Sequence, residues 1–391
     1  MTLAACGGSG GESTAAGDGD GRGGDPVKVM ALGPIDAPSF SIPSIAVGAK
    51  AGVEAVNAAG GAGGREVELI LCDDGNDPNT AAGCARRAVK EGVAAIVGGY
   101  TAFEPQVVPI VERAGIPWIG PTALQNSTSP SYWLLGGEGA TLAFAMGFDL
   151  VARSCARSAG IGESLSPVKA GVGLFDLGVK AAGGTTAEAA YGAQGTADWA
   201  PVVAAATGAG ADCLAILSSP ATAPQIVTAA AQSGRAIELT APLSVLPAQS
   251  VSALGGVADG TTLMSGYLPF SADAPAVRRL RAQARAIDPE VPLDAVLEST
   301  YAATLVFAEA ARGLDEVDAE SVAAALPRVR GFDTGLGPVV DFSAENPARA
   351  FARVVNTKVF VLRAQDGEIV LAQPEPIDTL PAFEALAAAG R

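Results

Sequence analysis

Histidine is absent from the 391 residues of this chain. Without an imidazole, every Ser-His or Cys-His catalytic arrangement and every His-ligated zinc site is excluded. The phosphate-binding P-loop pattern does not occur either. The sequence therefore offers no residue on which a catalytic mechanism could be built. We expect no catalytic residue, no metal and no cofactor.

Long apolar runs are also missing. None approaches the roughly 20 apolar residues that a membrane-spanning helix needs, and runs such as Ala302–Ala311 are broken by Thr or Glu. Basic residues are outnumbered, and the net charge of −16 makes nucleic acid a poor partner. The remaining composition, 49% apolar and 17% charged, is globular, and the length suits two domains.

Cysteine is scarce and odd in number, with five residues in all. In an exported protein, an odd number of cysteines leaves at least one without a disulfide partner, and the role of that residue needs an explanation. We predict that Cys6 is modified and that Cys72–Cys84 and Cys155–Cys213 are disulfides. The alternative is that these four are free, buried thiols.

The N-terminus is poor in residues that could form a core. Residues 7–25 are rich in glycine and lack aromatic and branched aliphatic side chains, so we expect a flexible tether. Just before it, Leu3-Ala4-Ala5-Cys6-Gly7 resembles a bacterial lipobox, in which the cysteine receives a lipid. The charged and apolar parts of a signal peptide do not precede it, so we expect the natural chain to begin further upstream. Residues 1–25 are thus interpreted as a lipobox remnant and a tether, with Cys6 anchoring the protein to the outer face of the cell membrane.

From Val27 onward, short apolar runs typical of strands alternate with segments typical of helices. This alternation stops after Ile119 and resumes near Cys155. Two successive units of this kind predict two α/β lobes, each with a parallel, doubly wound sheet. Later segments, including an expected strand at Pro338–Phe342 and a hairpin at Arg353–Leu371, should complete the sheets.

Several short motifs recur in a fixed order along this pattern. They are Asn57–Arg65 (NAAGGAGGR), Cys72–Pro78 (CDDGNDP), Ala114–Pro117 (AGIP), Gly120–Ala123 (GPTA), Thr196–Trp199 (TADW), Ala209–Asp212 (AGAD), Tyr301–Ala303 (YAA) and Leu336–Val339 (LGPV). Taken together, the ordered set resembles the leucine/isoleucine/valine-binding family of type I periplasmic solute-binding proteins, which serve ABC transporters.

The resemblance implies two lobes joined by a three-crossover hinge, with a ligand held between them. On that pattern, lobe one is 26–140 plus 269–340, lobe two is 141–268 plus 341–380, and 381–391 is a C-terminal tail. It also implies a monomer that delivers a small amino acid or organic acid to ABC permease subunits and touches the membrane only through its lipid.

Loops that follow strands supply the candidate ligand-binding residues of lobe one. Tyr100-Thr101-Ala102 precedes an expected helix, whose N-terminal N–H groups and the threonine hydroxyl suit a carboxylate. Thr122-Ala123-Leu124 follows the next strand, and in the family both loops line the pocket. Ordinary strand-to-helix loops are the alternative. Phe40 and Tyr267 are candidate apolar walls, or else ordinary core.

The acidic triplet Asp73, Asp74 and Asp77 does not have the spacing of a calcium loop. Turn formation and helix capping explain it better.

Lobe two offers Ser218, Ser219 and Leu243, which also follow expected strands. Amino-acid binders of the family have an acidic residue near the position of Leu243. This chain has Pro242-Leu243-Ser244 there. Because an unpaired buried ammonium is costly, either another acid replaces it or the ligand has no amine. Glu298 is our candidate acid, with a solvated helix glutamate as the alternative.

We therefore expect a lipid-anchored, extracytoplasmic solute-binding protein that closes on its ligand by hinge motion. The breadth of the resemblance favours an amino acid or a close relative, and an amine-free acid, for example an aromatic one, is the alternative. A ligand-sensing receptor module on the same fold is a second function to be weighed.

Overall fold

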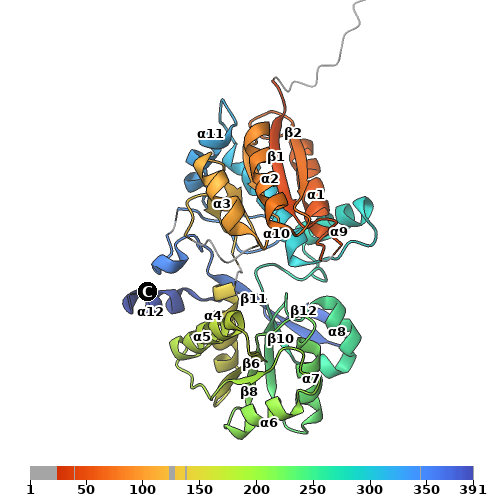
Figure 1. The fold of residues 1–391 in the computed structure, drawn as a ribbon, viewed down its shortest axis with the longest axis vertical. Coiled ribbons are helices and arrows are strands. Elements are labelled where there is room, and N and C mark those ends of the chain that lie inside the picture. Colours follow the sequence, from red (N-terminus) through yellow and green to blue (C-terminus); the bar gives the residue numbers. More distant parts are fainter. Residues whose placement is uncertain (1–23, 39, 123–127, 137–138, 344, 391) are drawn as a thin grey trace, which may run out of the picture.

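The computed structural model describes residues 24–38, 40–122, 128–136, 139–343 and 345–390. Its helices and strands form two lobes, each built around one sheet, as Figure 1 shows. Cys6, Ala123 and Leu124 lie outside the described residues. Within the part of the chain that is described, no helix is long and apolar enough to cross a membrane.

Lobe one contains a five-stranded sheet in the order β2-β1-β3-β4-β5, and every pairing in it is parallel. The strands are β1 (Val27–Gly33), β2 (Val67–Asp73), β3 (Ala95–Val97), β4 (Trp118–Ile119) and β5 (Tyr132–Trp133). The helices of this lobe are α1 (Ser44–Ala58), α2 (Pro78–Glu91), α3 (Glu104–Arg113), α9 (Pro275–Ile287), α10 (Ala295–Ala310) and α11 (Ala319–Ala325).

Both faces of the first sheet are covered, which explains the almost continuous apolar sequence of β1. Val29 packs into the core formed with α1, α9 and α10. Met30, which points to the other face, packs into the core formed with α2 and α3. Strand β1 lies between β2 and β3 and is thereby fixed, so the loop at its carboxyl end is held in place.

Lobe two contains the larger sheet, in which β12-β11-β10-β9-β8-β6-β7 are neighbours in that order and β13 pairs with β11. Its strands are β6 (Ser158–Glu163), β7 (Ala190–Gly192), β8 (Cys213–Ile216), β9 (Glu238–Pro242), β10 (Thr262–Ser265), β11 (Lys358–Gln365), β12 (Glu368–Leu371) and β13 (Ile377–Asp378). Its helices are α4 (Gly139–Ala152), α5 (Ser166–Ala181), α6 (Ala200–Gly208), α7 (Ala223–Gln232) and α8 (Ala248–Leu254).

The second sheet is parallel from β7 to β10 and becomes antiparallel where β11 joins it. The hairpin of β11 and β12 therefore completes this sheet, as expected. The strand expected at Pro338–Phe342 does not form, and only one bridge joins Phe332 to Val340. Gly335 and Gly337 precede this segment and its first residue is a proline, which cannot donate a ladder hydrogen bond.

The chain passes between the sheets three times: after β5, after β10 and before β11. The three-crossover, two-lobed architecture is thus confirmed. Most of the expected tail forms α12 (Leu380–Ala388), where Phe383 is buried. Its ring lies 4.9 Å from that of Phe144 in α4 and 5.5 Å from that of Phe351. This helix consequently packs at the junction of the lobes (Figure 1).

Both expected disulfides are present. Cys72 at the end of β2 is bonded to Cys84 in α2, and Cys155 is bonded to Cys213 at the start of β8, with Cα separations of 5.8 and 6.0 Å. Asp212 lies beside the second pair. Since both sulfurs there are covalently bonded, that group is not a metal site.

Candidate functional site

A cavity of about 720 Å³ lies between the two lobes. Lobe one contributes the loops after β3 and β4, and lobe two contributes the ends of β8, β9 and β10 with one face each of α4 and α5. Ligands of parallel α/β sheets bind beyond the carboxyl ends of the strands, as this cavity would require. Its volume falls within the roughly 300–1,000 Å³ of small-molecule sites.

The loop Tyr100–Ala102 forms part of the lobe-one wall. It follows Gly98, which has φ 58° and where a Cβ would lie 2.3 Å from the Cα of Thr300, so only glycine lets the loop approach α10. Thr300 also accepts a hydrogen bond from the N–H of Gly99, at 3.1 Å. The loop is therefore anchored on the buried helix α10.

The hydroxyl of Thr101 is already engaged inside lobe one. It donates to Oδ2 of Asp74 at 2.7 Å and accepts from the N–H of Phe103 at 3.2 Å. Among the described residues, the backbone N–H groups of Thr101 and Ala102 have no protein partner. A carboxylate at this wall would therefore meet backbone donors, and the threonine hydroxyl would act by shaping the loop.

The acidic triplet forms turns and a helix cap, as the sequence predicted. Asp77 is the N-cap of α2 and accepts from the N–H groups of Asn79 and Thr80, and its pKa is lowered mainly by the Thr80 hydrogen bonds. Asp74 is fully buried, and burial raises its pKa although the Thr101 hydrogen bond opposes the shift. Asp73 accepts from backbone N–H groups of the neighbouring loop and turn.

Thr122 borders the cavity from the next loop. Its hydroxyl lies 3.1 Å from that of Ser299 in α10, and Ser299 also donates to the carbonyl of Val296 at 3.1 Å. Each hydroxyl has one proton, so while Ser299 donates to Val296, Thr122 donates to Ser299 and can only accept from a ligand. Thr122 can donate to a ligand once Ser299 turns its proton from Val296 to Thr122.

Ser218 and Ser219 are bound to a carboxylate that sequence reasoning missed, Glu163 at the end of β6. The two hydroxyls donate to its oxygens at 2.8 and 2.7 Å. Burial would raise the pKa of Glu163, but hydrogen bonds from Thr222, Ser219 and Ser218 outweigh it and lower the pKa to about 2. Ser218 lines the cavity, and since its proton is committed it can only accept from a ligand. The position of Glu163 at the end of a buried strand was the signal available in the sequence.

The remaining candidates are divided between the cavity and its surroundings. Leu243 and Tyr267 line the cavity, together with Ser244 and Ser265. Phe40 does not line it: its side chain is 49% exposed, and its ring lies edge-on 6.3 Å from that of Tyr100.

Glu298 is 1% exposed and is absent from the cavity wall, where Ala295 and Ser299 of the same helix lie instead. Among the described residues, its Oε1 has no hydrogen-bond partner. Burial raises the pKa of Glu298 well above its usual value, and the negative charge of Asp294 adds to the shift. These effects favour the protonated carboxyl, so in this arrangement Glu298 offers no charge to a ligand's ammonium.

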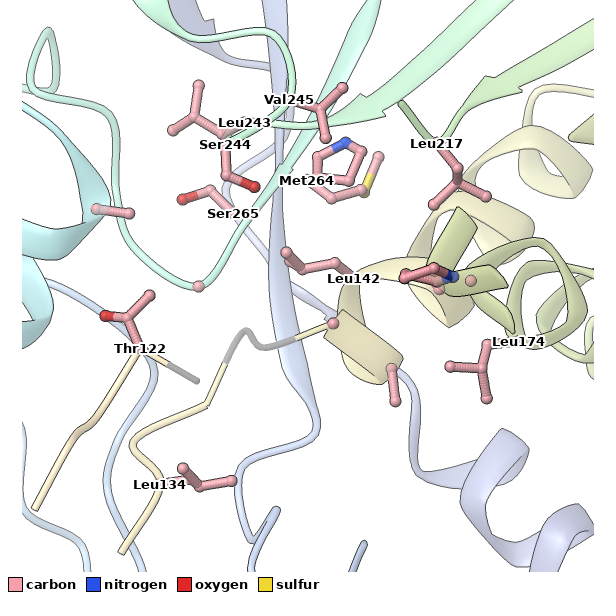
Figure 2. A pocket seen from close by; sticks show the side chains of 18 of the residues that line it. Thr122, Leu134, Leu142, Leu174, Leu217, Leu243, Ser244, Val245, Met264 and Ser265 are labelled. Carbon is pink, nitrogen blue, oxygen red and sulfur yellow. The ribbon is translucent and has the colours of Figure 1, made fainter. Parts of the chain in front are cut away.

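The cavity wall is mainly aliphatic. Among the described residues, no lysine or arginine lines it, and its one acidic residue, Glu104, is 1% exposed and lies close to Tyr132. Figure 2 shows Thr122, Ser244 and Ser265 towards one side and Leu142, Leu174 and Leu217 towards the other. The sequence had not pointed to these leucines, because their contributions to one wall come from three separate segments.

The model of the periplasmic binding protein family matches residues 26–368. A curated relative, a leucine-, isoleucine-, valine-, threonine- and alanine-binding protein of Pseudomonas aeruginosa, is 32% identical over 114 residues. That alignment covers 28% of this chain and spans 31% of the relative's length.

Solved structures share the fold over nearly the whole chain. A fatty acid ABC transporter substrate-binding protein from Thermomonospora curvata is 17% identical with a TM-score of 0.74, covering 92% of this chain and 95% of its own. A solute-binding protein from R. palustris in complex with 4-hydroxybenzoate is 18% identical with a TM-score of 0.72, covering 92% and 99%. A leucine-binding protein from Thermotoga maritima is 19% identical with a TM-score of 0.68, covering 90% and 99%.

Proposed function

The chain belongs to the periplasmic binding protein family, and from that premise we propose that it is the extracytoplasmic solute-binding subunit of an ABC importer. It would capture a small organic molecule between its lobes and deliver it to permease subunits. The molecule itself would undergo no covalent change.

One observation carries this proposal: a cavity of about 720 Å³ is walled by both lobes at once. A ligand that contacts the Tyr100–Ala102 loop and the ends of β8 to β10 stabilises the closed arrangement of the lobes over an open one. In our proposal, residues 26–140 plus 269–340 move against 141–268 plus 341–380, and the three crossovers absorb the rotation. Closure then reports occupancy to the permease.

The cavity favours a ligand without an amine. An ammonium would need a charged partner, and the carboxyl of Glu298 is buried away from the cavity wall, with burial raising its pKa. The carboxyl of Glu104 is nearly inaccessible. A carboxylate ligand, in contrast, finds N–H donors at Thr101 and Ala102. We therefore propose an amine-free carboxylic acid and set aside the amino acid that family membership alone would favour.

A thermal-shift screen tests both levels of this proposal, with amino acids, aromatic acids and aliphatic acids in parallel. A ligand present at a hundredfold excess over its dissociation constant stabilises the folded state by about 2.7 kcal/mol, which raises the melting temperature measurably. We expect amine-free acids to give this rise. If only amino acids raise it, the ligand class is wrong, and if no solute does, the binding function is.

Attachment through a lipid on Cys6 remains part of the proposal. The glycine-rich residues that follow would let the lobes reach a permease from the membrane surface, over roughly 25 Å for a flexible chain of this length. Mass spectrometry of protein purified from membranes should find a lipid on the N-terminal cysteine. An unmodified N-terminus upstream of Cys6 would contradict this attachment.

A further inference from the structure

One end of the cavity is lined by apolar side chains. We call it the aliphatic arm and define it by five side chains: Leu142 of α4, Val168 and Leu174 of α5, Leu217 after β8, and Met264 of β10. Four of the five, all but Met264, are only partly buried, so apolar surface faces the empty space. In Figure 2, Leu174 and Leu217 lie away from the hydroxyls of Thr122, Ser244 and Ser265, and Leu142 and Met264 lie between the two groups.

The arm is not a packing defect of the lobe-two core. Helix α5 packs its other face fully, with Val172 and Phe175 at 3% and 0% exposure. The face towards the cavity carries Pro167, Gly171 and Leu174, spaced three or four residues apart along one side of the helix. Because Gly171 on this side has no side chain, the space between α5 and Leu217 is left unfilled.

Water is a poor occupant of such a space, because a stable buried water needs several polar partners and the arm offers none from its side chains. An apolar ligand group is favoured there, since it removes both its own surface and that of the leucines from water. The opposite end of the cavity, with its hydroxyls and free backbone N–H groups, suits a carboxylate. The two ends together match one amphipathic molecule.

We propose that the aliphatic arm binds the hydrocarbon tail of a straight-chain carboxylic acid whose carboxylate lies at the Thr122 end. This inference rests on the proposed function and specifies its substrate class. The short side chain of a branched-chain amino acid would fill only part of a cavity of about 720 Å³. A longer chain would occupy both ends at once.

The affinity for a carboxylic acid should depend on the length of its hydrocarbon chain. Each methylene transferred from water into the arm should tighten binding about fourfold, which corresponds to about 0.8 kcal/mol. Affinity should rise with length until the arm is full and then level off. A site that recognises only the carboxylate would show no such dependence.

Two glycines of α5 give a matched pair of variants. A Cβ at Gly171 would lie 3.4 Å from Cδ2 of Leu217, so Gly171→Leu places a side chain inside the arm. Gly173 is exposed, and a Cβ added there would meet no atom within 4 Å, so Gly173→Leu changes the same helix without touching the cavity. Both substitutions replace glycine by a better helix former, which protects folding.

The experiment is calorimetric titration of the wild type and both variants with butanoate, octanoate, dodecanoate and leucine. We expect affinity to rise from butanoate to dodecanoate in the wild type and in Gly173→Leu. In Gly171→Leu, dodecanoate should bind at least about tenfold more weakly, as when two methylenes leave the arm, while butanoate is unaffected.

Equal affinities along the series, or equal loss in both glycine variants, would overturn the assignment of the arm. Tighter binding of leucine than of dodecanoate would also overturn it and would leave the solute-binding function standing. If none of the four solutes nor any member of the thermal-shift panel binds the wild type, the proposed function fails together with the arm.

Discussion

Thr101 and Thr122 occupy equivalent loops of neighbouring strands, yet their hydroxyls have different surroundings. The Thr101 hydroxyl supports the buried carboxyl of Asp74, whereas the Thr122 hydroxyl borders the cavity beside Ser299. At this scale, one threonine supports a buried carboxyl, and the other borders the cavity that we propose as the ligand site. The sequence presented both as equivalent ligand contacts, because the partner of each is supplied by a distant segment.

The two threonines predict opposite outcomes for the same substitution. Thr101→Val removes the donor to a buried carboxyl and should lower the free energy of unfolding by about 1–3 kcal/mol. Thr122→Val should leave that free energy nearly unchanged and weaken ligand binding. Urea denaturation and calorimetry on both variants separate the effects. A stable Thr101→Val protein with lost affinity would instead put its hydroxyl on the ligand.

Glu298 allows a prediction about pH. Because burial raises its pKa above the usual value of 4.5, the folded state holds this proton more tightly than the unfolded state. The resulting stabilisation is complete below the unfolded pKa and is lost as pH rises through the folded pKa. Glu298→Gln cannot ionise, so its stability relative to the wild type should increase from pH 5 to pH 9.

The control for that series is Glu320→Gln, an exposed glutamate of α11. This variant shows what replacing an exposed glutamate by glutamine does to stability over the same pH range. A stability difference for Glu298→Gln that does not change with pH would contradict the raised pKa of Glu298. For an amine-free ligand, Glu298→Gln should also leave affinity unchanged, whereas a tenfold loss would restore Glu298 as counter-charge to an ammonium.

At the scale of elements, the sequence predicted a helix or strand correctly where the signal lay within a single segment. The Asp77 cap followed by Pro78 marked the start of α2, and the alternation of runs marked the two sheets. Helix α4 was not foreseen, because it is apolar on all sides and has no periodic pattern to read. The absent strand at Pro338–Phe342 shows the reverse error, because this apolar run makes a single bridge and joins neither sheet.

The disulfides tie elements within each lobe, and their contributions should differ. Cross-linking removes entropy from the unfolded chain in proportion to the logarithm of loop length, giving about 3 kcal/mol for the separation of 12 residues and about 4 kcal/mol for 58. Paired Cys→Ser variants of each bond should therefore lose stability, with the Cys155–Cys213 pair losing more. Equal unfolding midpoints with and without reductant would contradict both contributions.

At the scale of the whole molecule, the order of motifs predicted the two lobes and the family, because topology constrains where such turns fall. The ligand was less accessible to the sequence. Leu142, Leu174 and Leu217 belong to separate elements of lobe two, and only the folded chain brings them to one wall. Family membership favoured an amino acid, and the chemistry of the assembled wall points to an apolar acid.

A crystal structure of the protein grown with dodecanoate would test the central claim most directly. The account predicts closed lobes with one continuous ligand between them. The carboxylate should lie within hydrogen-bond distance of the N–H groups of Thr101 or Ala102 or of the Thr122 hydroxyl, and the chain should run past Leu142 towards Leu174. Open lobes with the acid on an outer surface, or a carboxylate buried against Leu174, would contradict it.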